Sequence, residues 1–152
     1  MALWFECKVR FDKMMDNGSV KKVTEPYLVD ALSFTEAEAR ITEEMRPFLS
    51  GDFSIPAIKK TNIAEIFFDN TADKWWSVKY NIITIDEKSA KERRAAVYVM
   101  VQADSQQGAT DAFNKGMKGT MADYEIESIA ETRYMDVYPA KFLSDETGNA
   151  DG

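Results

Sequence analysis

The sequence predicts an α+β fold made by tandem duplication of a β-β-α-β unit. Two observations support this prediction. The amphipathic stretch WFECKVRF at 4–11 recurs 71 positions later as WWSVKYNI at 75–82. Each copy is followed by a hairpin signal, a helical pattern and a bent strand, in that order. Because such a unit buries little core alone, we expect one mostly antiparallel sheet with two helices on one face.

The first half opens with a predicted hairpin. Residues 4–11 alternate strictly between apolar and polar side chains, which is the period of a half-buried strand. Asn17-Gly18 predicts a turn, because both residues tolerate positive φ. Residues 20–29 then return as a second strand, in which Pro26 favours an edge position or a break.

A helix and a long strand complete the first half. Ser33 and Glu36 have the spacing of a capping box, which places a helix start at Ser33. The apolar face of this helix is expected to consist of Phe34, Ala37, Ile41, Met45 and Phe48. Residues 53–68 are then mostly β-like, and Pro56 together with the stretch 59–62 predicts a bend or bulge partway.

The second half repeats these elements. It predicts strands at 75–85 and 93–103, a helix at 105–118 and a last strand region at 124–138. The halves align at an offset of 71, which pairs Tyr27 with Tyr98, and a one-residue slip covers the helix. We therefore predict repeats at 3–70 and 74–141 within a single pseudo-two-fold domain spanning 1–143. Residues 144–152 are expected to form a disordered acidic tail.

The composition excludes several classes of function. The 152-residue chain has a net charge of −7, no histidine and one cysteine, Cys7. An acidic chain does not bind nucleic acid by bulk charge, although a local basic face is compatible with it. Without histidine, the commonest general base and metal ligand is missing, and Cys7 on an apolar strand face is expected to be inert. We expect no catalytic residue, no metal and no cofactor, and a cytoplasmic protein with no membrane segment.

Two acids remain as candidates for catalysis. Glu65 and Asp136 occupy equivalent positions in the apolar segments IAEIFF and YMDVYP. A pseudo-symmetric pair of carboxylates could share a site near a two-fold axis. The alternative, which we favour, is that both are outward-facing acids at strand ends.

The polar face of the two leading strands is the candidate binding site. The predicted binding residues are Trp4, Lys8, Arg10, Trp75, Lys79, Lys22 and Arg93. Indole rings near ammonium groups are typical of grooves for single-stranded nucleic acid, in which bases stack on the rings and cations contact phosphates. The alternative is that Trp4 and Trp75 pack at a sheet rim, between the halves or in a dimer interface.

The chain also resembles a known family. The strings WFECKVRFDK, VTEPYLVDALSFTEAEARI, EIFFDN and GMKGTMADYEIESI carry the resemblance, which covers about residues 3–139. They are similar to a family described as a domain of unknown function and found widely in gut Bacteroidetes and their phages. The resemblance implies an intracellular setting and a phage or mobile-element origin, but no activity and no site residues.

Two expectations of function follow. The first is a non-enzymatic protein that binds single-stranded nucleic acid through an aromatic and basic sheet face. The second is a module for protein–protein interaction or self-assembly, such as a homodimer, that uses the same face. An enzyme built on Glu65 and Asp136 is the least favoured, because no histidine and no catalytic motif accompany them.

Overall fold

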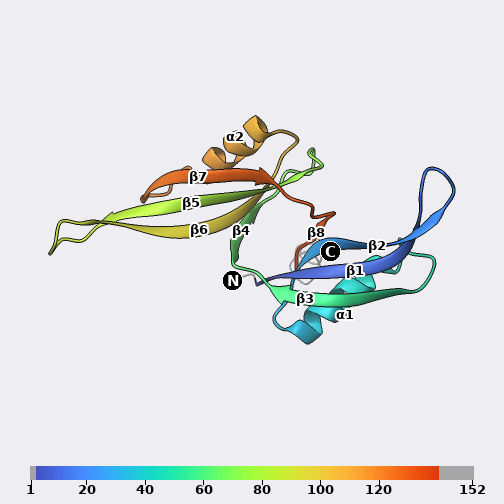
Figure 1. Cartoon of the computed structure of the whole chain (residues 1–152). Coiled ribbons are helices and arrows are strands. Elements are labelled where there is room, and N and C mark those ends of the chain that lie inside the picture. The colour runs from blue at the N-terminus through green and yellow to red at the C-terminus, as the bar shows by residue number, and fades with distance from the viewer. Residues whose placement is uncertain (1–2, 141–152) are drawn as a thin grey trace, which may run out of the picture. The chain divides into compact units, whose positions relative to one another are not determined.

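The computed structural model describes residues 3–140, which contain two helices and eight strands in two compact units (Figure 1). Unit 1 comprises the residues up to Thr61 together with those from Arg133, and unit 2 comprises Asn62–Thr132. The predicted α+β class is confirmed, and most strand pairs are antiparallel. The strands form two four-stranded sheets with one helix each, instead of the single sheet that we expected.

Unit 1 contains five elements, and its sheet has the strand order β3-β1-β2-β8. They are β1 (Trp4–Met14), β2 (Val20–Asp30), α1 (Phe34–Met45), β3 (Phe53–Lys60) and β8 (Val137–Tyr138). The β1–β2 hairpin turns at Gly18, whose φ of 85° suits a residue without Cβ. The Ser33 hydroxyl accepts from the Glu36 amide at 3.1 Å, and the Glu36 carboxylate accepts from the Leu32 amide at 3.0 Å, so the predicted cap is present.

Unit 2 has the same arrangement, with the strand order β4-β6-β5-β7. Its elements are β4 (Ile63–Phe67), β5 (Trp75–Ile85), β6 (Glu92–Gln102), α2 (Gln106–Gly116) and β7 (Asp123–Glu131). Read from β7, this order matches that of unit 1 strand by strand, with β4 in the place of β8. Ser105 caps α2 as Ser33 caps α1. The common order fits the predicted duplication, which stays a prediction, as does the single pseudo-two-fold domain.

Each repeat gives its last strand to the other unit. β3 and β4 are consecutive in sequence, but β3 pairs with β1 while β4 pairs in parallel with β6. In the same way, β7 pairs with β5 while β8 pairs in parallel with β2. The predicted strand regions at 53–68 and 124–138 are therefore wrong as single strands, because each is two strands that belong to different sheets. The first region divides after Lys60, inside the stretch 59–62 where a bend or bulge is predicted.

The two crossing points have the same hydrogen bonds. The carbonyl oxygen of Trp4 accepts from both the amide (2.9 Å) and the hydroxyl (2.8 Å) of Thr61. The carbonyl oxygen of Trp75 accepts from the amide and the hydroxyl of Thr132, both at 2.8 Å. Each threonine thus fixes the chain to the start of a leading strand, just where the chain leaves that sheet.

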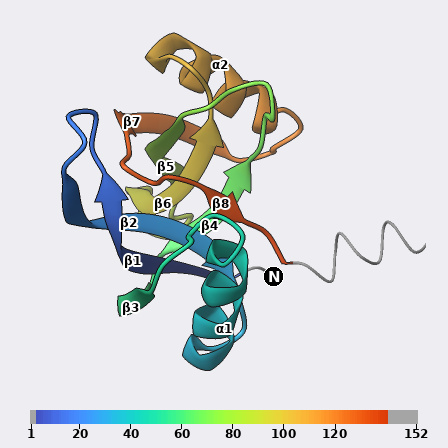
Figure 2. The ribbon, with the colours of Figure 1, turned by 90° about the vertical axis from the view of Figure 1, so that its right-hand side faces the viewer.

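One helix covers one face of each sheet. Figure 2 shows α1 along one face of the β1–β2 sheet. The buried core of unit 1 consists of Phe5, Cys7, Val9, Tyr27, Val29, Ala31, Ala37, Ile41 and Met45. At the start of the expected apolar helix face, Phe34 is 55% exposed, but its ring meets that of the core residue Phe5 edge-on at a centroid distance of 5.1 Å. The expected face is wrong at its other end, because Phe48 is 73% exposed and lies beyond the helix, which ends at Met45 before Pro47.

The strand registers correct the alignment of the repeats. Trp4 pairs with Asp30 in unit 1, and Trp75 pairs with Gln102 in unit 2, so β2 and β6 correspond at an offset of 72. The predicted pairing of Tyr27 with Tyr98 is therefore wrong by one residue. The slip begins in the hairpin, because the loop between β5 and β6 is one residue longer than that between β1 and β2. From β3 and β7 onward, the offset of 71 holds, since Ile58 pairs with Cys7 of β1 and Ile129 pairs with the equivalent Val78 of β5.

The predicted acidic tail at 144–152 lies outside the described residues. Within 3–140, no helix combines the length and the apolar character that crossing a membrane requires.

Candidate nucleic-acid interface

All predicted site residues except Arg93 lie on the sheet face opposite the helix, which we call the outer face of each unit. In unit 1 this face carries the even-numbered side chains of β1 and β2, because the odd-numbered ones build the core under α1. In unit 2 it carries the odd-numbered side chains of β5 and the even-numbered ones of β6. The polar face predicted for the leading strands is therefore the outer face.

The tryptophans on this face are buried. The exposed fraction is 5% for Trp4 and 4% for Trp75, whose ring meets that of Phe68 edge-on at a centroid distance of 5.7 Å. Because a base needs an open ring face on which to stack, the expectation of exposed indole platforms is wrong. Both residues start a leading strand at a crossing point, where their carbonyl oxygens hold Thr61 and Thr132.

The predicted cations of unit 1 are exposed and lie on one face. Lys8 and Arg10 follow each other along that face of β1, and Lys22 faces them from β2, opposite Asp12. Lys59 joins them from β3, opposite Glu6, and was not predicted. Lys22 lies 3.7 Å from the Asp12 carboxylate. Within residues 3–140, no ion pair involves the other three cations.

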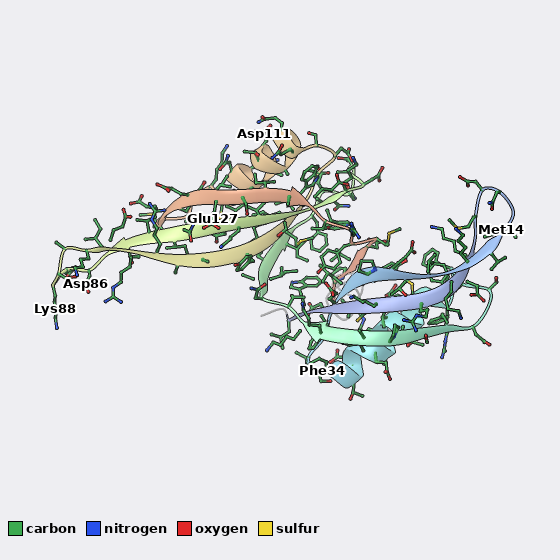
Figure 3. All side chains as sticks on the ribbon, viewed as in Figure 1. Met14, Phe34, Asp86, Lys88, Asp111 and Glu127 are labelled. Carbon is green, nitrogen blue, oxygen red and sulfur yellow. The ribbon has the colours of Figure 1, made fainter. Side chains whose placement is uncertain are left out.

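The predicted cations of unit 2 are paired. The Lys79 ammonium lies 2.7 Å from the Glu127 carboxylate and 5.7 Å from the centre of the Tyr98 ring. The hydrogen bond to Glu127 is the main reason that the pKa of Lys79 is raised. The Arg93 guanidinium lies 3.2 Å from Asp86 near the end of the hairpin, where Figure 3 labels Asp86 far from Glu127. Arg93 also pairs with Thr84, which places it on the helix side of the sheet, so it does not share a face with Lys79.

Arg94, not Arg93, is the outer-face arginine of β6. Its guanidinium contacts Glu125 at 2.9 Å and Glu92 at 3.1 Å. The hydrogen bond to Glu125, followed by that to Glu92, raises the pKa of Arg94. The bond from Arg94 also lowers the pKa of Glu125. At the offset of 72, Arg94 corresponds to Lys22.

A β-bulge explains why Lys79 is paired and Lys8 is not. The register of β7 against β5 shifts between Lys79 and Tyr80, which leaves Glu127 as the extra residue. The Glu127 side chain bonds Lys79 and Asn81 on the outer face. The register of β3 against β1 shifts at the equivalent place, where residues 55 and 56 are skipped. At the offset of 71, Pro56 occupies the position of Glu127, so β3 offers Lys8 no carboxylate at that position.

The family of the chain can now be stated. The model of one family, described as Domain of unknown function (DUF4494), matches residues 3–140. The chain belongs to this family. The match spans residues of both units and both crossing points. No curated protein and no solved structure matches the chain.

The two candidate acids of this family member, Glu65 and Asp136, belong to different units. Glu65 belongs to unit 2, where its charge raises the pKa of Tyr80 alongside burial. Asp136 belongs to unit 1, where its main-chain oxygen accepts from the Leu28 amide at 3.1 Å. Between residues 3 and 140, no three side chains of Cys, Asp or Glu gather in a way that could hold a metal ion.

Proposed function

We propose that the protein binds single-stranded nucleic acid through phosphate contacts on the outer face of unit 1. The observation that supports this proposal is the arrangement of Lys59, Lys8, Arg10 and Lys22. These four exposed cations, which we call the cationic track, come from three neighbouring strands. A phage or mobile-element origin, as the resemblance implies, would be consistent with such a ligand.

The register places the cationic track on a diagonal. Lys59 lies on β3 beside Glu6 of β1. The next two outward positions of β1 are Lys8 and Arg10. Lys22 lies on β2 beside Asp12, the outward position that follows them. Two residues along a strand span about 7 Å and neighbouring strands are about 5 Å apart, so consecutive cations are spaced by roughly 7–8 Å. One extended polyanion crossing the sheet can therefore meet all four in succession.

The chemistry of the track differs from the one first expected. Because Trp4 and Trp75 are buried, no indole platform contributes stacking. Phosphate contacts carry no sequence information and release counterions, so binding should be indifferent to base sequence and steeply salt-dependent. The net charge of −7 opposes binding at long range. Binding is therefore expected to be strongest for flexible single strands that touch only the track.

The test is a fluorescence-anisotropy titration with a labelled single strand of mixed sequence. The wild type is measured at about 50 mM and about 200 mM salt, which spans a steep part of the expected dependence. The double variant Lys8→Ala, Arg10→Ala should bind more weakly. It should also reduce the slope of log K against log salt by about 1.4, because each lost contact to a single strand removes about 0.7.

Unit 2 supplies the matched control. The comparison is with Lys8→Ala alone, since each of these single variants removes one positive charge. Lys79→Ala removes the equivalent of Lys8, a cation that Glu127 already neutralises. It should leave affinity and slope unchanged. An absence of binding by the wild type at low salt would refute the proposal. An equal loss with Lys79→Ala would also contradict it, because the effect would then reflect overall charge.

A further inference from the structure

The outer faces of the two units carry opposite charge. On β1, β2 and β3 the outer face of unit 1 has four cations and three carboxylates, and one of these, Asp30, is only 8% exposed. On β5, β6 and β7 the outer face of unit 2 has two cations, Lys79 and Arg94, and four exposed carboxylates. These carboxylates are Glu92, Asp123, Glu125 and Glu127.

The difference arises at equivalent positions of similar frameworks. Glu127 and Glu125 of β7 correspond to Pro56 and Ser54 of β3 at the offset of 71. Glu92 of β6 corresponds to Val20 of β2 at the offset of 72. The backbones of the two faces have the same strand order and the same bulge position. The two faces are therefore similar in form but opposite in charge.

We propose that the outer face of unit 1 binds the outer face of unit 2 of a second copy of the chain. Such a contact joins two different surfaces, so each added copy leaves one basic and one acidic face unused. Contacts of this kind are heterologous and build open chains unless the rotation closes a ring. Assembly should consequently grow with protein concentration instead of stopping at a dimer.

The strength of the contact follows from its charges. Ion pairs between exposed groups are individually weak and are screened by salt. Arg94 and Lys79 already neutralise part of the negative charge of Glu125 and Glu127. The net attraction therefore comes from the negative charge of this face that remains unneutralised. We expect association at low salt and high protein concentration, and its loss at about 200 mM salt, where the Debye length is under about 10 Å.

The inference is independent of nucleic-acid binding, and its test is carried out without nucleic acid. Sedimentation velocity at low salt measures the mass distribution of two variants and of their mixture. The first variant, Lys8→Glu with Arg10→Glu, makes both outer faces acidic. The second, Asp123→Lys with Glu125→Lys, makes both faces basic and keeps the Lys79–Glu127 pair. Each variant alone should be monomeric, and the equimolar mixture should associate at least as strongly as the wild type.

A third variant controls for total charge. Lys115→Glu with Lys118→Glu makes the same change in net charge as the first variant, at the end of α2 and not on an outer face. It should associate like the wild type. Circular dichroism confirms that every variant is folded. The inference is overturned if the wild type stays monomeric at low salt, if the first variant still associates alone, or if mixing restores nothing.

Discussion

Cys7 illustrates how the fold decides the chemistry of a single residue. Its side chain is completely buried on the helix side of β1. Burial, with a smaller contribution from the charge of Glu6, raises the pKa of the thiol from 9.0 to about 12. The thiolate is the reactive form of cysteine, so Cys7 should be inert for two reasons, access and protonation.

We predict that Cys7 of the native protein does not react with a thiol-specific chromogenic reagent at about pH 9, near its unperturbed pKa. The denatured chain should react at once and stoichiometrically, and Cys7→Ser should give no signal in either state. The folded pKa lies above the unfolded one, so the stabilising contribution is complete below pH 9.0 and is lost as pH rises toward about 12. Rapid labelling of the native protein would contradict the prediction.

The repeated Trp and Thr residues show what the alternation of residue types in a strand can and cannot predict. Alternation along 4–11 correctly places Trp4 on the face away from the core of Phe5 and Cys7. It cannot show that the ring is buried, because covering a sheet face is a property of tertiary structure. Trp4 and Trp75 lie at the crossing points, where their main-chain carbonyl oxygens accept from Thr61 and Thr132.

At the level of elements, the bulges of β3 and β7 decide which cations are available. Glu127 sits at the bulge of β7 and neutralises Lys79, while Pro56 holds the equivalent position of β3 and cannot do the same for Lys8. Pro56 was read from the sequence as a bend or bulge, and the shifted register confirms it. Its effect on the charge of the neighbouring strand could be recognised only once the register was known.

Replacing the bulge residue should transfer the behaviour of unit 2 to unit 1. Pro56→Glu places a carboxylate where Glu127 stands relative to Lys79. It should pair with Lys8, weaken binding of a single strand and reduce the salt slope by about 0.7, the share of one phosphate contact. NMR titration should show a pKa of the new carboxyl below the usual range, as the hydrogen bond from Lys79 produces for Glu127.

Pro56→Gln is the control for the backbone. It restores the same amide and a side chain of the same size without charge, so affinity and slope should stay at wild-type values. If Pro56→Gln weakens binding as much as Pro56→Glu, the bulge geometry and not the charge of Lys8 governs the interaction. A carboxyl with an ordinary pKa in Pro56→Glu would show that no pair forms.

At the scale of the molecule, the sequence predicts the elements better than their partners. Alternation, turn residues and caps identify both hairpins and both helices, because each signal is local. No local signal shows to which sheet β4 and β8 belong, because IAEIF and VY have the same pattern whichever sheet they complete. For the same reason, the paired state of Lys79 and the one-residue slip between the hairpins emerge only from the strand register.

The exchange of strands means that a sequence repeat and a folding unit differ. Residues 62–132 contain all four strands and the helix of unit 2. Residues 74–141, the second predicted repeat, lack β4 and carry β8 without its partner β2. β4 contributes Ile66, which is 8% exposed, and Phe67, whose ring lies 6.3 Å from that of Phe113 in the core. Without β4, these contacts and one edge of β6 are lost.

We therefore predict that a fragment of residues 62–132 folds, and that a fragment of residues 74–141 does not. A unit of this size has a small core, so the first fragment should melt cooperatively at a modest temperature, with dispersed amide signals in NMR spectra. In the fragment of residues 74–141, β6 lacks its parallel neighbour β4, and no Phe67 ring is present to pack beside Gly116. At Gly116 an added Cβ would come within 2.7 Å of the Phe67 ring, so α2 is fitted to β4. Equal or greater stability of the second fragment would show that the repeat, and not the exchanged unit, is what folds.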